Sequence, residues 1–425
     1  MKIFITLLFT GFTSLFSFAQ NIDKIINATE VERIEKVLSS DDMQGRKTFT
    51  PSIDKAADFI AGEFEKSGLK YFDGLKSYKQ PFSMIKAELI SASGSMDNHP
   101  VNPDNIIPIA TDAKLSFNEK SGYTKVIIDS TANLVREVFN LIKSNKKYLV
   151  LINNFHAKNF NRLKGFNRES FETKTPIVLV LSDENPSTYN FEIKNEITSS
   201  SLANVVGVLP GKSRKDEYVI FSAHYDHLGI GKPDAKGDSI YNGANDDAAG
   251  TTAVIMLANY FSQLNNNERT LLFVAFTAEE IGGFGSQYFS QQIDPEKTVA
   301  MFNIEMVGTQ SKWGKNSAYI TGYEKSDFGK ILQTNLSGSN FYFEPDPYPA
   351  QNLFYRSDNA TLAALGVPAH TISTSKMDNE PNYHQQSDEI ETLDMNNMAE
   401  IIKAIALSSK TIVSGKDTPT RVEKR

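Results

Sequence analysis

The chain has no cysteine and only one tryptophan among its 425 residues. Without cysteine it forms neither disulfides nor thiolate metal sites, so any metal ion must be held by histidine, aspartate or glutamate. Basic residues are also outnumbered, with 44 Lys and Arg against 51 Asp and Glu. This balance argues against a nucleic-acid-binding protein, which needs a basic surface. The hydrophobic fraction of 40% is typical of a globular protein.

Long hydrophobic runs are confined to the N-terminus. Residues 1–19 carry one early lysine and an apolar stretch that ends in Ser17, Phe18 and Ala19, a small-x-small cleavage pattern. Thr, Ser and Gly interrupt this stretch, and it is short for a membrane span. These features favour a cleaved signal peptide over a retained anchor. We therefore predict an exported protein, periplasmic or secreted, with no membrane span in the mature chain.

Hydrophobic periodicity organises the rest of the chain. Helical spacing appears in residues 22–38 and 53–67, and strands alternate with helices from 203 to 413. This alternation predicts an α/β fold with a mostly parallel, mixed central sheet sandwiched by helices. Residues 86–202 contain short β-like runs instead. The expected domains are a signal peptide (1–19), a discontinuous α/β domain (20–85 and 203–413), an inserted β-rich module (86–202) and a flexible tail (414–425).

Acids and histidines follow the expected strands or lie in the loops beside them. The set comprises His224, Asp226, Asp246, Glu279, Glu280, Glu305 and His384, with Tyr383 beside the last. Ligands of such sheets gather beyond the carboxyl ends of the strands, so we expect these side chains to share one edge. Several acids at one edge repel each other unless cations are present, and a mixed His/carboxylate set suits zinc. The number of ligands fits two ions with a bridging carboxylate and room for a bridging water.

Each of these residues also has an ordinary structural explanation. The Glu-Glu pair could be a solvated turn, and Asp246 could cap the helix that follows it. Three further residues are expected to be structural. They are His227, Asp247 as a helix-cap or turn acid, and His370 in an apolar strand. Arg356 is expected to be a surface or structural arginine.

The order of the motifs resembles a known family. It runs His-x-Asp at 224–226, Gly-x-x-Asp-x-x-x-Gly at 243–250, Glu-Glu at 279–280, Asn-x-Glu-Met at 303–306 and Tyr-His at 383–384. This order is similar to that of the secreted co-catalytic zinc aminopeptidases, whose family includes aminopeptidase Y, glutamate carboxypeptidase II and the glutaminyl cyclases. The resemblance covers about residues 203–413. It implies a mixed sheet between helices, with an inserted protease-associated or apical domain as in several members.

The resemblance implies a metal ligand at five positions. His224 and Glu305 would bind one zinc, Glu280 and His384 would bind the second, and Asp246 would bridge both. The family's aminopeptidases usually have Asp where this chain has Glu305.

It also implies three supporting roles. Glu279 would be the general base, which takes a proton from the bridging water and passes it to the leaving amine. Tyr383 would donate a hydrogen bond to the developing oxyanion. Asp226 would orient His224.

The implied function is that of a dizinc metallo-exopeptidase, an aminopeptidase that hydrolyses the N-terminal bond of peptides through a metal-bridging hydroxide. Two alternatives use the same scaffold: a single-zinc glutaminyl cyclase-type acyltransferase and a carboxypeptidase, which would need a cationic pocket. An inactive binding module would have lost a ligand or the base, and none is missing. The sequence leaves open the preferred N-terminal residue, the role of the insert and the oligomeric state.

Overall fold

The computed structural model describes residues 22–425, so the expected signal peptide lies outside the described residues. The chain forms two compact units. The first contains the chain up to Pro81 together with Leu202–Arg425, and the second is Phe82–Ser201. The chain passes from one unit to the other within strands β2 (Lys79–Met96) and β9 (Tyr189–Leu209). None of the helices within residues 22–425 has both the length and the apolar character that a membrane span requires.

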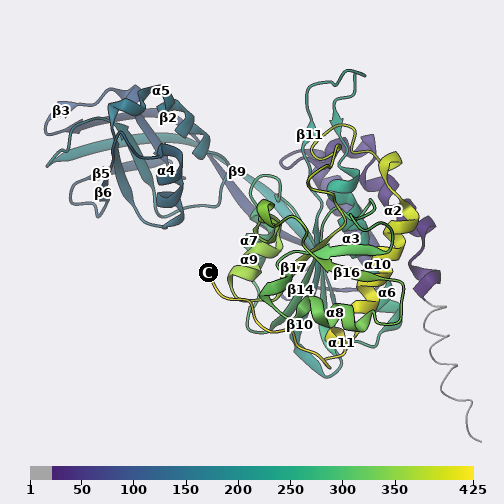
Figure 1. Cartoon of the computed structure of the whole chain (residues 1–425). Helices are drawn as coiled ribbons and strands as arrows, with labels where there is room; N and C mark the ends of the chain where they lie inside the picture. Colours follow the sequence, from purple (N-terminus) through teal and green to yellow (C-terminus); the bar gives the residue numbers. More distant parts are fainter. Residues whose placement is uncertain (1–21) are drawn as a thin grey trace, which may run out of the picture. The chain divides into compact units, whose positions relative to one another are not determined.

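The first unit is built on a mixed sheet, which confirms the expected α/β fold (Figure 1). Its strands follow the order β16, β15, β17, β14, β10, β13, β9. The strands not yet given are β10 (Arg214–His224), β13 (Arg269–Phe276), β14 (Thr298–Ile304), β15 (Ser317–Ile320), β16 (Tyr342–Pro345) and β17 (Ala369–Ser373). Strand β10 pairs in parallel with β13 and β14, and β14 with β17. The β13–β9 and β15–β17 pairs are antiparallel.

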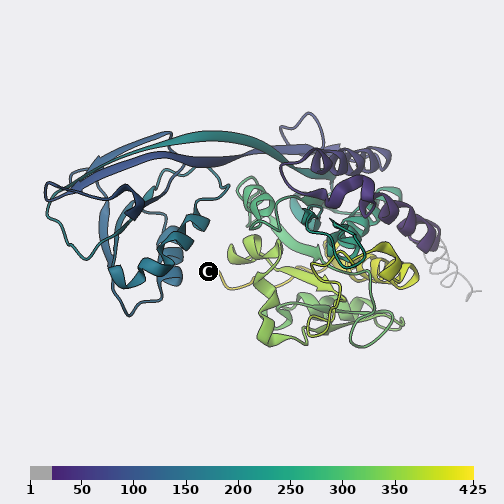
Figure 2. The ribbon, with the colours of Figure 1, turned by 90° about the horizontal axis from the view of Figure 1, so that it is seen from above.

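Helices cover both faces of this sheet, so its central strands are buried along their whole length. Helix α6 (Ala249–Leu264) crosses one face and packs with α2 (Ala28–Leu38), α3 (Pro51–Lys66) and α10 (Met395–Ser408) (Figures 1 and 2). Helices α7 (Phe284–Ser290) and α9 (Asn359–Ala364) pack together on the other face. Alternate residues of a strand point to opposite faces. Phe221 and Phe273 accordingly stack with Phe261 of α6, while Ile220 and Leu272 join the opposite core.

Smaller elements complete the first unit. Helix α8 packs against β16 and α10. The elements are β1 (Lys70–Tyr71), β11 (Gly229–Ile230), β12 (Ile240–Tyr241), α8 (Phe328–Asn335) and α11 (Lys410–Val413).

The second unit has a sheet of its own, in the order β4, β8, β7, β6. Strands β6, β7 and β8 are parallel, and α4 lies between β6 and β7 in the sequence. The second unit therefore contains parallel strands and helices as well as the expected short β-runs. The elements are β3 (His99–Pro100), β4 (Ile106–Ile109), β5 (Lys114–Asn118), β6 (Thr124–Ile128), α4 (Leu134–Lys143), β7 (Tyr148–Ile152), α5 (Ala157–Phe160) and β8 (Ile177–Leu181).

The C-terminal residues differ from the expected flexible tail. Val422 is buried in the core that contains α9. The Arg421 guanidinium donates hydrogen bonds to the backbone oxygens of Thr298 and Pro295. The buried Val422 and the hydrogen bonds of Arg421 therefore fix this segment on the first unit.

Candidate metal centre

The parallel strands bring the expected site residues to one edge of the sheet. Strands β10, β13, β14 and β17 run in the same direction, so their carboxyl ends lie together. His224 ends β10, the Glu279–Glu280 pair follows β13, and Glu305 follows β14. Asp246 comes from the irregular turn before α6, and His384 from the loop after β17.

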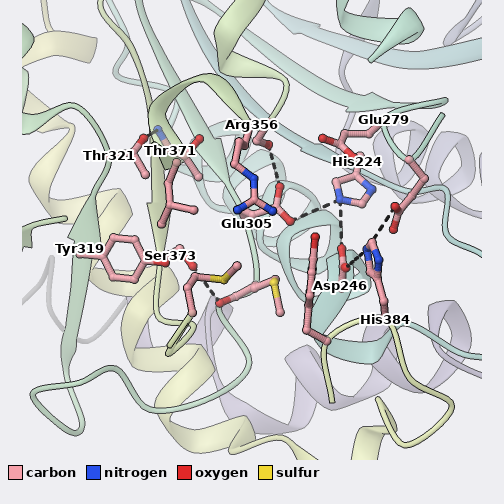
Figure 3. Close-up of a pocket in the computed structure, with 16 residues that line it drawn as sticks. His224, Asp246, Glu279, Glu305, Tyr319, Thr321, Arg356, Thr371, Ser373 and His384 are labelled. Carbon is pink, nitrogen blue, oxygen red and sulfur yellow. Dashed lines mark hydrogen bonds and ion pairs between the residues drawn. The ribbon is translucent and has the colours of Figure 1, made fainter. Parts of the chain in front are cut away.

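The ligand-type side chains line one pocket (Figure 3). His224 Nε2 lies 3.3 Å from Asp246 Oδ1 and 3.4 Å from Glu305 Oε1. His384 Nε2 lies 3.3 Å from Asp246 Oδ2 and 3.2 Å from Glu280 Oε2. Asp246 therefore presents one carboxylate oxygen to each histidine.

These separations fit side chains that share a cation. Zinc binds nitrogen and oxygen at about 2.0–2.2 Å, so two ligands at a tetrahedral angle lie about 3.3 Å apart. In addition, Asp246 Oδ2 and Glu280 Oε1 are buried and have no hydrogen-bond partner. Leaving such oxygens unpaired is costly. The residues present at this edge therefore fit a bound metal ion such as zinc.

Burial and crowded acids shift the pKa values at this edge. Burial raises the pKa of Glu279 well above its usual range, and the nearby carboxylate of Asp358 raises it further. The carboxylates of Asp246 and Glu280 raise the pKa of His384 to about 10. The two carboxylates therefore favour the positively charged form of His384. A metal cation bound at the same place would neutralise their negative charge instead.

Comparison with known proteins matches part of the chain to a family model. The sequence model of Peptidase family M28 matches residues 204–408, a stretch that we call the M28 segment. Among curated relatives of this M28 segment, aminopeptidase YwaD of Bacillus subtilis (strain 168) is 22% identical over 245 residues, which are 54% of this chain and 48% of YwaD. The chain spans about half the length of the curated relatives it matches.

Solved structures share the fold of the M28 segment. The aminopeptidase from Aneurinibacillus sp. strain AM-1 aligns with a TM-score of 0.55 and 16% identity, covering 95% of this chain and 97% of its own. The Porphyromonas gingivalis glutaminyl cyclase aligns with a TM-score of 0.51 and 13% identity, covering 92% of this chain and 99% of its own. At these sequence identities, both similarities show a shared fold and nothing further.

The carboxylate of Asp226 has different hydrogen-bond partners from the one expected. The hydrogen bond of His224 Nδ1 is with the backbone oxygen of Asp226, at 3.0 Å, while the carboxylate Oδ1 is 3.8 Å away. The carboxylate instead accepts the backbone N–H groups of Glu279 at 3.1 Å and Glu280 at 3.3 Å. Asp226 therefore holds the Glu279–Glu280 turn, and its backbone rather than its side chain orients His224.

The buried carboxylate of Asp388 holds a second turn in the same way, the one that contains Asn245 and Asp246. Asp388 accepts the N–H groups of Asn245 at 2.9 Å and Asp246 at 3.0 Å. Its only signal in the sequence was its position four residues after His384.

Asp247, expected as a turn or cap acid, links three segments. Its carboxylate accepts N–H groups from Gly250, Met306 and His224. It therefore joins the start of α6 to the ends of β14 and β10.

Ser357 accounts for the position of Glu305. Its hydroxyl donates to Glu305 Oε2 at 2.7 Å, which leaves Oε1 facing His224. Ser357 thereby fixes the longer side chain of Glu305 at a position where the resemblance led us to expect aspartate. No sequence pattern indicates this contact, because Ser357 lies in a separate loop.

Arg46 supports the site from the N-terminal segment. This fully buried arginine ends the irregular helix Asp41–Arg46. Its guanidinium donates to the backbone oxygens of Leu38, Tyr225, Asn242 and Gly243 at 2.6–2.8 Å. It therefore ties the N-terminal helices to the two loops that carry His224 and Asp246.

Beyond the acids, the pocket has an apolar and hydroxyl-bearing side. Its other lining residues are Met306, Tyr319, Thr321, Leu353, Arg356, Ser357, Thr371, Ser373, Met377 and Tyr383. The ring of Tyr383 stacks on His384 with centroids 4.0 Å apart. Burial raises the pKa of the Tyr383 hydroxyl, so this group stays a proton donor. Arg356, expected at the surface or in a structural role, brings a positive charge to the pocket wall.

Proposed function

We propose that the chain is an exported dizinc aminopeptidase that removes N-terminal residues from peptides. The match of residues 204–408 to the model of Peptidase family M28 supports the reaction class. The aminopeptidase names of its relatives support the direction of attack on the substrate. The leader pattern of residues 1–19 supports action in the periplasm or outside the cell.

Two metal positions share Asp246 in this proposal. His224 and Glu305 would hold one ion, and Glu280 and His384 would hold the other. Zinc bound there would lower the pKa of a water and polarise the scissile carbonyl of the substrate.

Glu279 is the proposed general base. It lines the same pocket as the ligands, and Asp226 fixes its backbone. A carboxylate with a raised pKa accepts a proton more readily near neutral pH. Glu279 takes the proton of the attacking water and delivers it to the leaving amine.

The rest of the pocket binds the substrate. Tyr383 would donate a hydrogen bond from its hydroxyl to the carbonyl oxygen as negative charge develops there. Met306, Leu353 and Met377 offer apolar contacts for the side chain of the N-terminal residue.

One observation carries this proposal. Five ligand-type side chains, from turns far apart in the sequence, meet at 3.2–3.4 Å around Asp246 with Glu279 in the same pocket. A structural cluster of acids would not need the metal-like spacing or the neighbouring base.

The test uses aminoacyl-nitroanilide turnover together with metal counting. Glu279→Gln is expected to lower kcat by about 10²–10⁴-fold with unchanged zinc content, because only proton transfer is removed. Glu296→Gln, at an exposed glutamate of the first unit, is the matched control and should keep full activity. Full activity of the Glu279→Gln protein would overturn the assignment of the base.

Two alternatives are resolved by a substrate panel. The fold likeness to a glutaminyl cyclase keeps acyl transfer open, and one tightly bound zinc with cyclisation of N-terminal glutamine would establish it. Arg356 in the pocket wall could bind a substrate carboxylate, as a carboxypeptidase requires. Turnover of N-blocked peptides with a free carboxylate, lost in Arg356→Met, would establish carboxypeptidase action. Turnover of free-amine substrates alone supports the aminopeptidase.

A further inference from the structure

His227 is a third histidine at the metal centre. Its side chain is fully buried, and Nδ1 lies 2.8 Å from Glu280 Oε1 and 4.0 Å from Asp246 Oδ2. Neither ring nitrogen of His227 has a hydrogen-bond partner in the described structure. Glu280 Oε1 and Asp246 Oδ2 are unpartnered as well. Four polar atoms without an aligned hydrogen bond thus belong to three adjacent, buried side chains.

The neighbouring backbone fixes the ring of His227 at this place. Gly243 has a φ of 56°, and a Cβ there would lie 2.6 Å from His227 Cγ. Only glycine leaves room for the ring against the loop that carries Asp246. The packing therefore places the histidine beside the acids rather than in a separate apolar core.

The same ligand atoms are close enough to share an ion. The ligand atoms of His227, Asp246 and Glu280 all lie within 4.8 Å of one another. A hydrogen bond between Nδ1 and Glu280 Oε1 would have satisfied both atoms, yet the pair lacks the alignment of one.

We propose that His227 Nδ1 is a further ligand of the metal ion held by Glu280 and His384, and that the two metal positions are therefore unequal. This inference rests on the proposed dizinc function. The position of His227, Asp246, Glu280 and His384 has four protein ligands. The position of His224, Asp246 and Glu305 has three. Zinc sites closed by four protein ligands are typically structural, whereas catalytic sites keep an open position.

The unequal ligand sets assign different duties to the two ions. The ion at the four-ligand position is held tightly and released last. The ion at the three-ligand position exchanges first and keeps room for water and the substrate carbonyl.

Crystallography of the zinc-loaded wild-type protein with anomalous data tests the ligand directly. We expect zinc about 2.0–2.1 Å from His227 Nδ1, the usual zinc–histidine distance. A zinc more than about 3 Å from both ring nitrogens would overturn the proposal. This measurement does not depend on whether any variant folds.

Release of zinc to a chelator tests the inequality. Zinc per chain, followed by elemental analysis, should fall in two steps for the wild-type protein. In His227→Ala the slow step should accelerate by at least about 10–100-fold, the effect of losing even an outer partner of a metal ligand. His370→Asn is the matched control, because His370 is equally buried but bonded to Ser326 and Thr321. Its two steps should keep their rates.

The outcomes separate this inference from the proposed function. A zinc-loaded, active peptidase with equal release steps, or with unchanged steps in His227→Ala, overturns only the role of His227. A protein that binds no zinc overturns both. Two unequal ions in a protein without peptidase activity uphold the ligand set and overturn the function.

Discussion

The metal centre and the Arg46 support adjoin each other in the first unit, yet their polar groups are satisfied in opposite ways. Arg46 donates to four backbone oxygens at 2.6–2.8 Å. At the metal centre, the buried side-chain atoms without a hydrogen-bond partner include both ring nitrogens of His227, Asp246 Oδ2 and Glu280 Oε1.

This difference separates scaffold from site. Buried polar groups are nearly always paired, because an unpaired one costs about 1–3 kcal/mol. A group that is fully bonded within the chain holds the fold in place. Groups without a hydrogen-bond partner that gather at one edge of the sheet indicate that a ligand from outside the chain completes them. Four experiments sharpen or break this contrast.

Removal of metal should have the largest effect. With zinc at about 1,000 times its dissociation constant, chelation should lower the free energy of unfolding by about 4 kcal/mol for each equivalent site. Thermal melting with and without chelator measures the change, and added zinc should restore the melting temperature. An unchanged melting temperature in protein that demonstrably bound zinc would contradict the view that the unpaired atoms await a cation.

Loss of Arg46 should destabilise the fold with or without metal. Arg46→Met leaves the oxygens of Leu38, Tyr225, Asn242 and Gly243 without their donor, and we expect a loss of about 3–5 kcal/mol in urea unfolding. Lys36 is a suitable control for an exposed cation, because its side chain is 61% exposed and pairs with Glu32, which is 44% exposed. Lys36→Met should cost less than about 1 kcal/mol. Equal losses in Arg46→Met and Lys36→Met would remove the distinction drawn for Arg46.

The sequence predicted the α/β fold and the residues that meet at the sheet edge. Residues such as Glu280 and Glu305 directly follow apolar strands, and parallel strands end at the same edge. The meeting of these residues at one edge thus follows from two facts: each comes after an apolar strand, and parallel strands end at the same edge of a sheet. The α/β class followed from the alternation of strands and helices in the same way.

The sequence did not reveal the residues that act on the backbone across long separations. Arg46 contacts carbonyl oxygens 179 and 197 positions away, and no local pattern marks a side chain whose partners are main-chain atoms. We expected His227, next to Leu228 and Gly229, to be structural. Its closeness to Glu280 depends on how two strand ends are placed.

Glu35 should give the next effect, one that depends on pH. Glu35 of α2 is buried, and burial raises its pKa to about 8 from 4.5. The folded chain therefore keeps a proton that the unfolded chain releases, so this group makes stability fall as pH rises from about 4.5 to 8. Glu35→Gln should match the wild type near pH 4.5 and be more stable by on the order of 2–3 kcal/mol at pH 8. Urea unfolding at the two pH values measures this difference, and an equal difference at both would contradict the buried, protonated acid.

Asp226→Asn should have the smallest effect on stability and a selective effect on catalysis. Asp226 accepts two N–H groups of the Glu279–Glu280 turn, and asparagine offers a single acceptor oxygen for them. Losing one bond should cost about 1–2 kcal/mol. The loosened turn carries the proposed base, so kcat should fall by about 10-fold or more while the zinc content is kept.

Asp388→Asn is the matched variant for this experiment. Asp388 holds the turn of Asn245 and Asp246 in the same way, but that turn carries the shared ligand instead of the base. It should therefore weaken zinc binding more than it lowers kcat at saturating zinc. If both variants changed kcat and zinc affinity in the same proportion, the two carboxylates would serve only general stability. A separation of the two effects would assign each buried acid to the turn it holds.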